Sequence, residues 1–580
     1  MRLILATLIA VTVFTTALTG CSKGSDQQPS AAKSQGLTLL QDPLLKKLPP
    51  STAIFSIFDA SGAAYQGVKK TPWMKATGTG SLQQVIDQIK SSGASESSLK
   101  TVQALYETVQ KLGLLSATGE STVDTVMSRS VGFFALAPQD EVPVEAGLYL
   151  TAAPGVSLKS KLQLLEQALG EMDLLVSAQK IGGVDGLVAK IPGVPEAMTA
   201  RAAIYVAATD SLMAISSSKS GAESLFSSAE TDTLQNMQRS PEFQKAATAV
   251  NSAVPCMSFT FMDLKKISAL AETMGLPAAG PSGVREFEPK DIPIDAIAMQ
   301  QGFGTQLITA ISASVSGRTD TQTKVLQALE GSSLPLSMAR LPSDTAIAFA
   351  FDTKFISKLE DVVKSFSPDK AAEAAAAFQQ AKPLQGITFG LKNGDGSSPI
   401  PDLFVVIEAT NRDALGSMAE GLMGQGMAGA TGQSAMQWSA KEIEGVPTKF
   451  INTMFGAGVY LGSPKGSNSL LISSSERAIK ELIAASSGAR PGIAASLSAP
   501  LKANLAPQKL ISYYANLPQL GSLLDSAKSS LAMFTGGSAE LDQALDSTRL
   551  KKLGLITGSV SYANGLFLLE SVMDGPQGAR

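Results

Sequence analysis

The sequence predicts an α+β protein made of two homologous domains, each an antiparallel sheet with helices packed on one face. The main observation is an internal repeat, because residues 48–59 (LPPSTAIFSIFD) align with residues 341–352 (LPSDTAIAFAFD) and share seven of twelve residues. Later segments match in the same order at spacings that drift slowly along the chain. Collinear matches of this kind are typical of a duplicated unit with loop insertions.

Five later matches extend the repeat. They pair 134–136 with 389–391, 148–149 with 403–404, 177–184 with 439–446, 215–218 with 472–475, and 314–316 with 559–561. The first half holds extra residues over 76–113, where apolar spacing predicts two helices, and the second half gains residues over 421–437. We therefore place the first α+β domain at 40–330 and the second at 331–580.

Each half combines strand and helix patterns. Strands are expected at 52–58, 131–136, 146–151 and 212–216, where β-branched and aromatic residues lie between turn formers. An apolar stripe predicts a helix over 157–172, and Ser367-Pro368-Asp369 predicts the start of another. Turn-forming residues at 138–141 and 393–396 predict hairpins, which make the sheet antiparallel.

The first 21 residues predict export and lipid attachment. Arg2 precedes an apolar run, residues 3–17, that is too short to span a bilayer, and Leu18-Thr19-Gly20-Cys21 follows. This segment resembles the lipobox of bacterial lipoproteins. The resemblance implies that residues 1–20 are a lipoprotein signal peptide and that Cys21 receives the lipid, a palmitate-type acyl group. Residues 21–39 are polar, lack periodicity and predict a flexible tether.

Ser22, which follows the lipobox cysteine, is not the aspartate that resembles an inner-membrane retention signal. By analogy with enterobacterial sorting, we expect a lipid anchor in the bacterial outer membrane and a chain that faces the periplasm. The inner membrane and the cell surface are the alternatives. No later stretch has the length of a membrane-spanning helix, so Cys21 is the expected attachment to the membrane.

The amino-acid composition limits the reactions, metal sites and partners that this chain can have. The chain has no histidine, which excludes Ser-His and Cys-His nucleophiles and imidazole metal ligands. Forty-seven basic and 50 acidic residues show no basic stretch, so nucleic acid is not an expected partner. Cys256, the one cysteine besides Cys21, lies in an apolar segment that predicts a buried strand. We expect no cofactor and no metal.

Several motifs allow two interpretations, one structural and one functional. Residues 424–429 fit a G-x-G-x-x-G phosphate loop or a flexible loop, and Ser216–Ser218 and Ser473–Ser475 fit helix caps or an anion site. Acids between Glu286 and Asp295 fit a solvated loop or a calcium site. Ser-x-x-Lys pairs, the spacing of a Ser-Lys hydrolase, occur at Ser30/Lys33, Ser97/Lys100, Ser216/Lys219 and Ser367/Lys370.

An apolar stripe follows in the second half. It contains Leu415, Met418, Leu422, Met423 and Met427 at helical spacing. The stripe predicts either core packing or an adaptable surface that binds partners or acyl chains, since methionine suits surfaces that repack.

The L-P-x-x-T-A opening, the I-S-S-S segment before a helix and the export signal together resemble an uncharacterised family of bacterial envelope proteins, a resemblance that implies no activity. We expect a lipid-anchored cell-envelope protein with a non-catalytic binding, scaffolding or assembly role. Its partners would be envelope proteins or an apolar ligand. One alternative is a hydrophobic-ligand or lipid carrier. Another is a histidine-independent hydrolase with a Ser-Lys or carboxylate pair, for which the repeated acids Asp59 and Asp352 are the first candidates.

Overall fold

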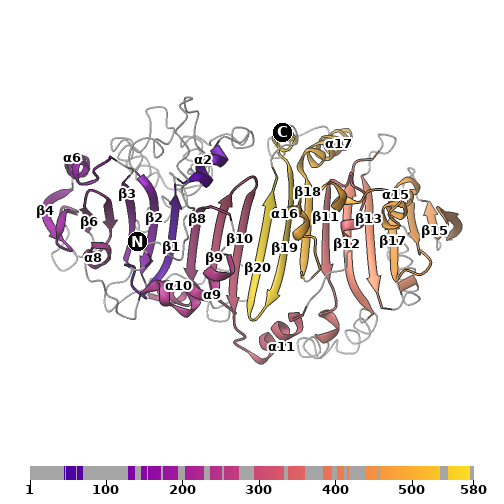
Figure 1. Ribbon diagram of the computed structural model, residues 1–580, viewed down its shortest axis with the longest axis horizontal. Helices are drawn as coiled ribbons and strands as arrows, with labels where there is room; N and C mark the ends of the chain where they lie inside the picture. The colour runs from indigo at the N-terminus through magenta and orange to yellow at the C-terminus, as the bar shows by residue number, and fades with distance from the viewer. Residues whose placement is uncertain are drawn as a thin grey trace. The chain divides into compact units, whose positions relative to one another are not determined.

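A computed structural model gives the fold, and the chain divides into two compact units, residues 1–315 and 316–580, which are described separately (Figure 1). The structure describes residues 45, 47–59, 62–69, 128–136, 145–152, 155–171, 174–193, 203–226, 236–250, 254–273, 293–331, 338–359, 383–394, 401–410, 415–416, 438–452, 458–507, 509–535 and 547–574. Among these residues, no helix is long and apolar enough to cross a membrane.

The first unit is built on an antiparallel sheet with the strand order β4-β5-β6-β7-β3-β2-β1-β8-β9-β10. The strands are β1 (Thr52–Asp59), β2 (Ser128–Leu136), β3 (Glu145–Ala152), β4 (Leu175–Ile181), β5 (Val184–Lys190), β6 (Ala203–Ala208), β7 (Leu212–Ser216), β8 (Cys256–Asp263), β9 (Ile294–Phe303) and β10 (Leu307–Val315). The four strands expected from the sequence correspond to β1, β2, β3 and β7, and Cys256 opens the buried strand β8. Those predictions are confirmed.

The second unit repeats this order as β14-β15-β16-β17-β13-β12-β11-β18-β19-β20, again antiparallel throughout. The strands are β11 (Ile347–Asp352), β12 (Leu384–Lys392), β13 (Asp402–Ala409), β14 (Ser439–Ile443), β15 (Val446–Asn452), β16 (Gly458–Gly462), β17 (Ser469–Ser473), β18 (Ile511–Asn516), β19 (Leu555–Ala563) and β20 (Leu566–Met573). The predicted α+β class, with an antiparallel sheet and helices, is confirmed.

The ladders correct parts of the sequence alignment. Phe133 pairs with Ser56 and Phe389 pairs with Phe349, so the equivalent of Phe389 is Phe133 rather than Phe134. The match of 148–149 with 403–404 is off by two residues, since Ser216 pairs with Gly147 and Ser473 with Phe404. The match of 314–316 with 559–561 is wrong, because Ser314 lies in β10 and Ser559 in β19. Alternation along a strand repeats every two residues and fixes register poorly across loops of unequal length.

One hairpin matches in detail. Ile181 pairs with Val184 and Ile443 with Val446, which leaves two residues in each turn. Gly182 and Gly183 have φ of 57° and 83°, and Glu444 and Gly445 have 49° and 73°. Positive φ at both central positions is the type I′ turn that suits the twist of a two-residue hairpin.

Helices of the first unit lie on both faces of its sheet, which corrects the expected single covered face. The described helices are α2 (Ala63–Lys69), α6 (Leu162–Glu171), α8 (Lys219–Phe226), α9 (Pro241–Val250) and α10 (Leu264–Thr273), with 3-10 turns at 159–161 and 237–239. Phe243 of α9 packs on Phe259 and Phe261, whereas Leu165 of α6 packs on the opposite face, in a cluster with Leu150 and Phe58. Strand side chains are apolar on both faces here, so both need cover.

The described helices of the second unit are α11 (Asp320–Leu329), α15 (Glu476–Ser486), α16 (Ala499–Ala503), α17 (Leu517–Thr535) and α19 (Ser547–Leu550), with 3-10 turns at 338–340, 356–358 and 493–496. The boundary between the units precedes α11, whereas the sequence placed residues 316–330 in the first domain. The helix expected over 157–172 is confirmed as a 3-10 turn followed by α6. The expected helices at 81–90, 96–112 and after Ser367 lie outside the described residues.

Candidate functional site

A wide uncharged surface covers one face of the sheet in the second unit. Because directly paired residues of an antiparallel ladder project to the same face, the pairings give three rows across β13, β12, β11, β18, β19 and β20. We call these eighteen positions the apolar face. They are Ile407, Ile387, Phe351, Ile511, Val560 and Leu569; Val405, Phe389, Phe349, Tyr513, Gly558 and Ser571; and Leu403, Leu391, Ile347, Ala515, Ile556 and Met573.

The centre of the apolar face is open to solvent. Phe349 and Phe389 are each 40% exposed, and Phe351 and Leu403 are each 37% exposed. Phe351 and Phe389 meet edge to face with ring centroids 6.3 Å apart, so the rings form one cluster. Strand spacing of about 4.8 Å and a two-residue rise of about 7 Å give the rows an extent of about 24 by 14 Å. The largest apolar patch of a monomer is typically of this size and is often functional.

The opposite face of the same strands is core. Its residues alternate with those of the apolar face, and Ala348, Phe404 and Tyr514 are at most 1% exposed. Helix α15 covers this side, where Ile479 is fully buried near Gly462 of β16. The apolar face is therefore a second hydrophobic surface on strands whose core side is already covered.

The first unit carries polar side chains at several of the same ladder positions. Ser56, Ser258, Thr260, Gln301 and Thr309 take the places of Phe349, Ile511, Tyr513, Val560 and Leu569, in that order. Ser56 and Thr260 hydrogen-bond through their hydroxyls at 2.9 Å. Phe58 and Phe133 take the places of Phe351 and Phe389, so among the three rings the units differ at Phe349, where the fold accepts a serine.

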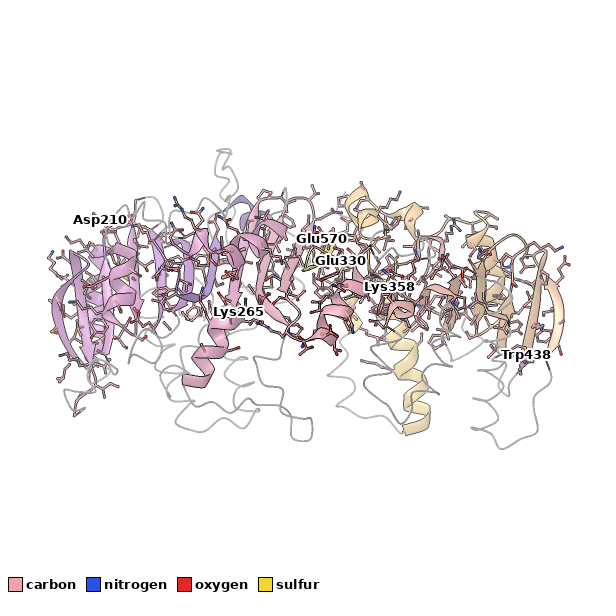
Figure 2. The ribbon with its side chains drawn as sticks, turned by 90° about the horizontal axis from the view of Figure 1, so that it is seen from below. Asp210, Lys265, Glu330, Lys358, Trp438 and Glu570 are labelled. Atoms are coloured by element: carbon pink, nitrogen blue, oxygen red, sulfur yellow. The ribbon has the colours of Figure 1, made fainter. Side chains whose placement is uncertain are left out.

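Helix α17 lies on the same side of the sheet as the apolar face. Figure 2 shows α17, in faint gold, extending from the sheet on the side on which Trp438 lies. Trp438 and Ile407 pack against the same buried cluster, which includes Leu384 and Leu470, and Ile407 belongs to the apolar face. Asn393, which follows β12, donates from its side-chain amide to the carbonyl of Gln519 in α17 at 3.4 Å. The helix and the aromatic rings thus share one side of the sheet.

Leu415 is the one described member of the predicted methionine-containing surface. It is 1% exposed and packs with Leu384, Ala409, Leu461 and Leu470, so core packing is correct for this residue and surface exposure is not. The remaining members, Met418, Leu422, Met423 and Met427, lie outside the described residues. Cys21 with its lipobox and the glycine loop at 424–429 also lie outside them.

The two serine triplets act as helix caps. Ser475 is the N-cap of α15 and accepts from the Ala478 N–H at 3.1 Å, and Ser218 accepts from the Gly221 N–H at 2.9 Å. A carboxylate already lies at each helix start. Asp402 accepts from the Ser475 hydroxyl at 2.7 Å, and Glu145 accepts from the Ser220 hydroxyl at 2.6 Å. These carboxylates occupy the place of an incoming anion, so the capping interpretation is correct.

Replacing Ser475 with alanine should lower the free energy of unfolding of the second unit by about 1 kcal/mol, the usual cost of a lost N-cap. The matched control is Ser487→Ala, at an exposed position just after the same helix, with an expected change below about 0.5 kcal/mol. Urea unfolding followed by Trp438 fluorescence in a Trp73→Phe background measures both. Equal effects of the two variants would contradict the capping assignment.

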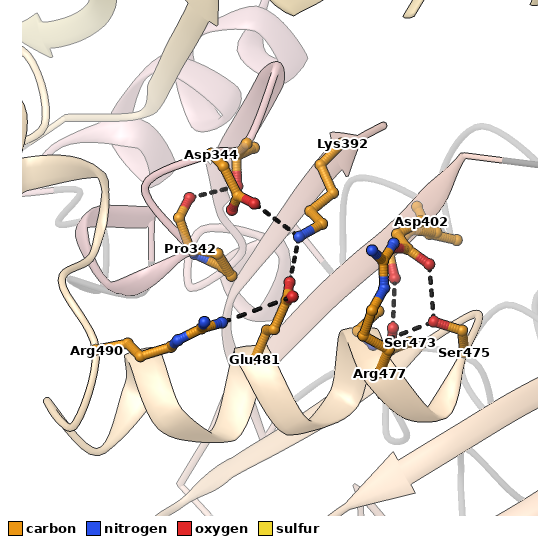
Figure 3. Close-up of polar contacts among 12 residues, drawn as sticks. Pro342, Asp344, Lys392, Asp402, Ser473, Ser475, Arg477, Glu481 and Arg490 are labelled. Atoms are coloured by element: carbon orange, nitrogen blue, oxygen red, sulfur yellow. Dashed lines mark hydrogen bonds and ion pairs between the residues drawn. The ribbon is translucent and has the colours of Figure 1, made fainter. Parts of the chain in front are cut away.

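A buried lysine lies at the end of β12 (Figure 3). The Lys392 ammonium contacts Glu481 of α15 and lies 2.7 Å from an Asp344 carboxylate oxygen, and Arg490 lies 3.6 Å from Glu481. The Lys392 side chain is 4% exposed. The two cations, Lys392 and Arg490, face two carboxylates, so this ion-pair network joins β12 and α15 to the segment before β11, and its lysine is not a free nucleophile.

The remaining polar candidates have structural surroundings. Ser216 donates to the Ala146 carbonyl, whereas Lys219 pairs with Glu223, so these two do not form a Ser-Lys dyad. The other three Ser-x-x-Lys pairs lie outside the described residues. Asp295 pairs with Lys265 at 3.1 Å, and Glu286, Glu288 and Asp291 lie outside the described part. Within that part, no group of three or more acids or cysteines could hold a metal ion.

The repeated acids and the thiol are buried at strand ends. Asp59 is 7% and Asp352 2% exposed, and Asp352 accepts from the backbone N–H of Lys354 at 2.8 Å. Burial raises the pKa of the Cys256 thiol, and the nearby Asp59 carboxylate raises it further. At neutral pH this thiol stays protonated, which makes it a poor nucleophile.

No protein-family model matches this chain, and no curated protein is significantly similar to it. A solved structure of TP0453, crystal form III, matches with 10% identity and a TM-score of 0.24, and the match covers 48% of this chain and 81% of that one. A likeness of this size carries no conclusion about fold or function.

Proposed function

We propose that this chain is a lipid-anchored cell-envelope protein with a non-catalytic binding role, whose second unit binds an apolar partner through the apolar face. The observation that carries the proposal is the exposure of three phenylalanines and a leucine at the centre of an uncharged sheet face. Soluble domains usually bury such residues.

The energy available at this surface is considerable. About 80 Å² of each exposed phenylalanine ring remains to be covered, since the side chain offers about 200 Å² and 40% is free. At about 25 cal/mol per Å², covering one ring is worth about 2 kcal/mol. The three rings together could therefore supply most of the free energy of a micromolar complex before the costs of association.

We propose that the two units are homologous. Such a duplication would allow the second unit to specialise. The same strand order, the same I′ hairpin and the same serine-capped helix after the seventh strand support this proposal. A duplicated unit can keep the fold in one copy while the other copy changes a surface. Ser56 and Thr260, at the places of Phe349 and Tyr513, fit such a division.

The lipobox supports the location. Attachment through Cys21 would hold both units near a bilayer, with the outer membrane and its periplasmic side favoured by Ser22. Envelope proteins and apolar ligands are the partners available there.

A fluorescent apolar probe, 1-N-phenylnaphthylamine, tests the binding role. We expect the chain without residues 1–21 to bind the probe, and the double variant Phe349→Ser/Phe389→Ser to bind it at least fivefold more weakly. The control is Leu175→Ser, which removes a 63% exposed leucine from β4 of the first unit. Equal binding by the double variant and the parent, with circular dichroism unchanged, would refute the proposal.

A further inference from the structure

We infer that the apolar face binds the acyl chains of phospholipid molecules, which makes this unit a lipid-binding module. The inference deepens the proposed function and rests on it. It depends on three properties of the apolar face: the chemistry of its side chains, its size, and the helix beside it.

The chemistry of the apolar face matches hydrocarbon. Its eighteen positions hold no charged side chain and no amide, and Tyr513 and Ser571 supply its two hydroxyl groups. Protein partners usually add about one hydrogen bond per 100–200 Å² of interface, which this surface offers few groups to make. An acyl chain needs none, so covering the phenylalanine rings leaves no polar group of those side chains unpaired.

The size of the apolar face also suits an acyl chain. One leaflet of a bilayer is about 15 Å of hydrocarbon, half of a core of about 30 Å. The rows extend about 14 Å along the strands and about 24 Å across them. One phospholipid with two chains therefore fits along Phe349, Phe351 and Phe389.

Helix α17 argues against a flat partner. It extends from the sheet on the side of the apolar face, so the sheet of a second copy cannot close to the separation of about 10 Å that packed sheets adopt (Figure 2). In the first unit Ser56 and Thr260, bonded to each other, take the places of Phe349 and Tyr513.

The test is lipid extraction from vesicles. Vesicles of palmitoyl-oleoyl phosphatidylethanolamine and phosphatidylglycerol, three to one, carry a pyrene-labelled phosphatidylglycerol dense enough to form excimers. The chain without residues 1–21 should convert excimer to monomer emission at about one lipid per protein. Phe349→Ser/Phe389→Ser should reduce the extracted lipid at least tenfold, whereas Leu175→Ser and Ser56→Ala should extract as the parent does.

The outcomes separate the two proposals. If the parent chain binds the probe but extracts no lipid, the acyl-chain inference is overturned and the proposed function stands. If the parent chain neither binds the probe nor extracts lipid, both proposals are refuted. Flotation of the protein with the vesicles without extraction would show a membrane-surface contact and overturn the inference. A concentration-dependent dimer in sedimentation equilibrium, abolished by the double variant, would assign the apolar face to a second copy and also overturn it.

Discussion

Replacing Gly132 with alanine should destabilise the first unit by about 3 kcal/mol or more. Gly132 faces Tyr149 across β2 and β3, and a Cβ atom at this position would lie 1.9 Å from the tyrosine ring. Tyr149 is fully buried and stacks on Phe55, with ring centroids 6.1 Å apart, so the ring cannot move aside. Overpacking of a rigid core commonly costs 1–3 kcal/mol, and this contact lies far inside the repulsive range.

The second unit provides a matched control. Gly558 faces Tyr513 in the same manner, and its added Cβ would lie 2.1 Å from the ring. Tyr513 belongs to the apolar face and is partly exposed, so its ring can rotate toward solvent. We expect Gly558→Ala to cost less than half as much as Gly132→Ala. Hydrogen exchange of peptides from β2–β3 and from β18–β19 measures the two local effects.

The cause is tested by a double variant. In a Tyr149→Ala background the ring is gone, so Gly132→Ala should cost less than about 1 kcal/mol. A cost of about 3 kcal/mol in that background would show that backbone strain, and not the ring, makes glycine necessary.

Replacing Lys392 with methionine should lower the stability of the second unit by about 3 kcal/mol. The methionine replaces the aliphatic part of the side chain but leaves Glu481, whose side chain is 15% exposed, without its closest cation. Removing one partner of a buried ion pair typically costs 3–5 kcal/mol, because the other charge stays desolvated. Arg490, 3.6 Å from Glu481, offsets part of this cost.

Two variants check this interpretation. Lys392→Met/Glu481→Met removes both charges and should recover at least half of the loss. Asp344→Asn removes a carboxylate that is 53% exposed and should cost less than about 1 kcal/mol. Urea unfolding followed by Trp438 fluorescence, again with Trp73→Phe, gives all three values. A double variant as unstable as Lys392→Met would show that packing volume, not charge, decides the effect.

Strands and caps could be predicted from the sequence because their signals are local. The alternation in 52–58 and the serines before residue 219 each specify an element within a few residues. The register of the strands and the sheet faces that helices cover could not be predicted, since both depend on partners that are distant in the chain. The segment 347–351, IAFAF, is apolar on both faces, which normally indicates burial on both sides. It contains no sign that one side is open.

For that reason the sequence does not predict the apolar face, and its pattern indicates an apolar surface at residues 415–427 instead. A signal was available in the repeat itself. Ser56 aligns with Phe349, so a polar position in one half is aromatic in the other. A difference of this kind between aligned units indicates a change of surface chemistry on a constant backbone.

The pairing of β1 with β8 sets a delay on folding. Ile54 and Met262 pair across 208 residues, whereas β4 to β7 pair only with near neighbours in the chain, apart from the contact of β7 with β3. At a synthesis rate of about 5–20 residues per second, β1 waits about 10–40 s for β8 to emerge. During that interval one edge of β1 is unpaired, and an unpaired apolar edge invites aggregation. Each unit therefore depends on protection of its central strand for seconds before its sheet can close.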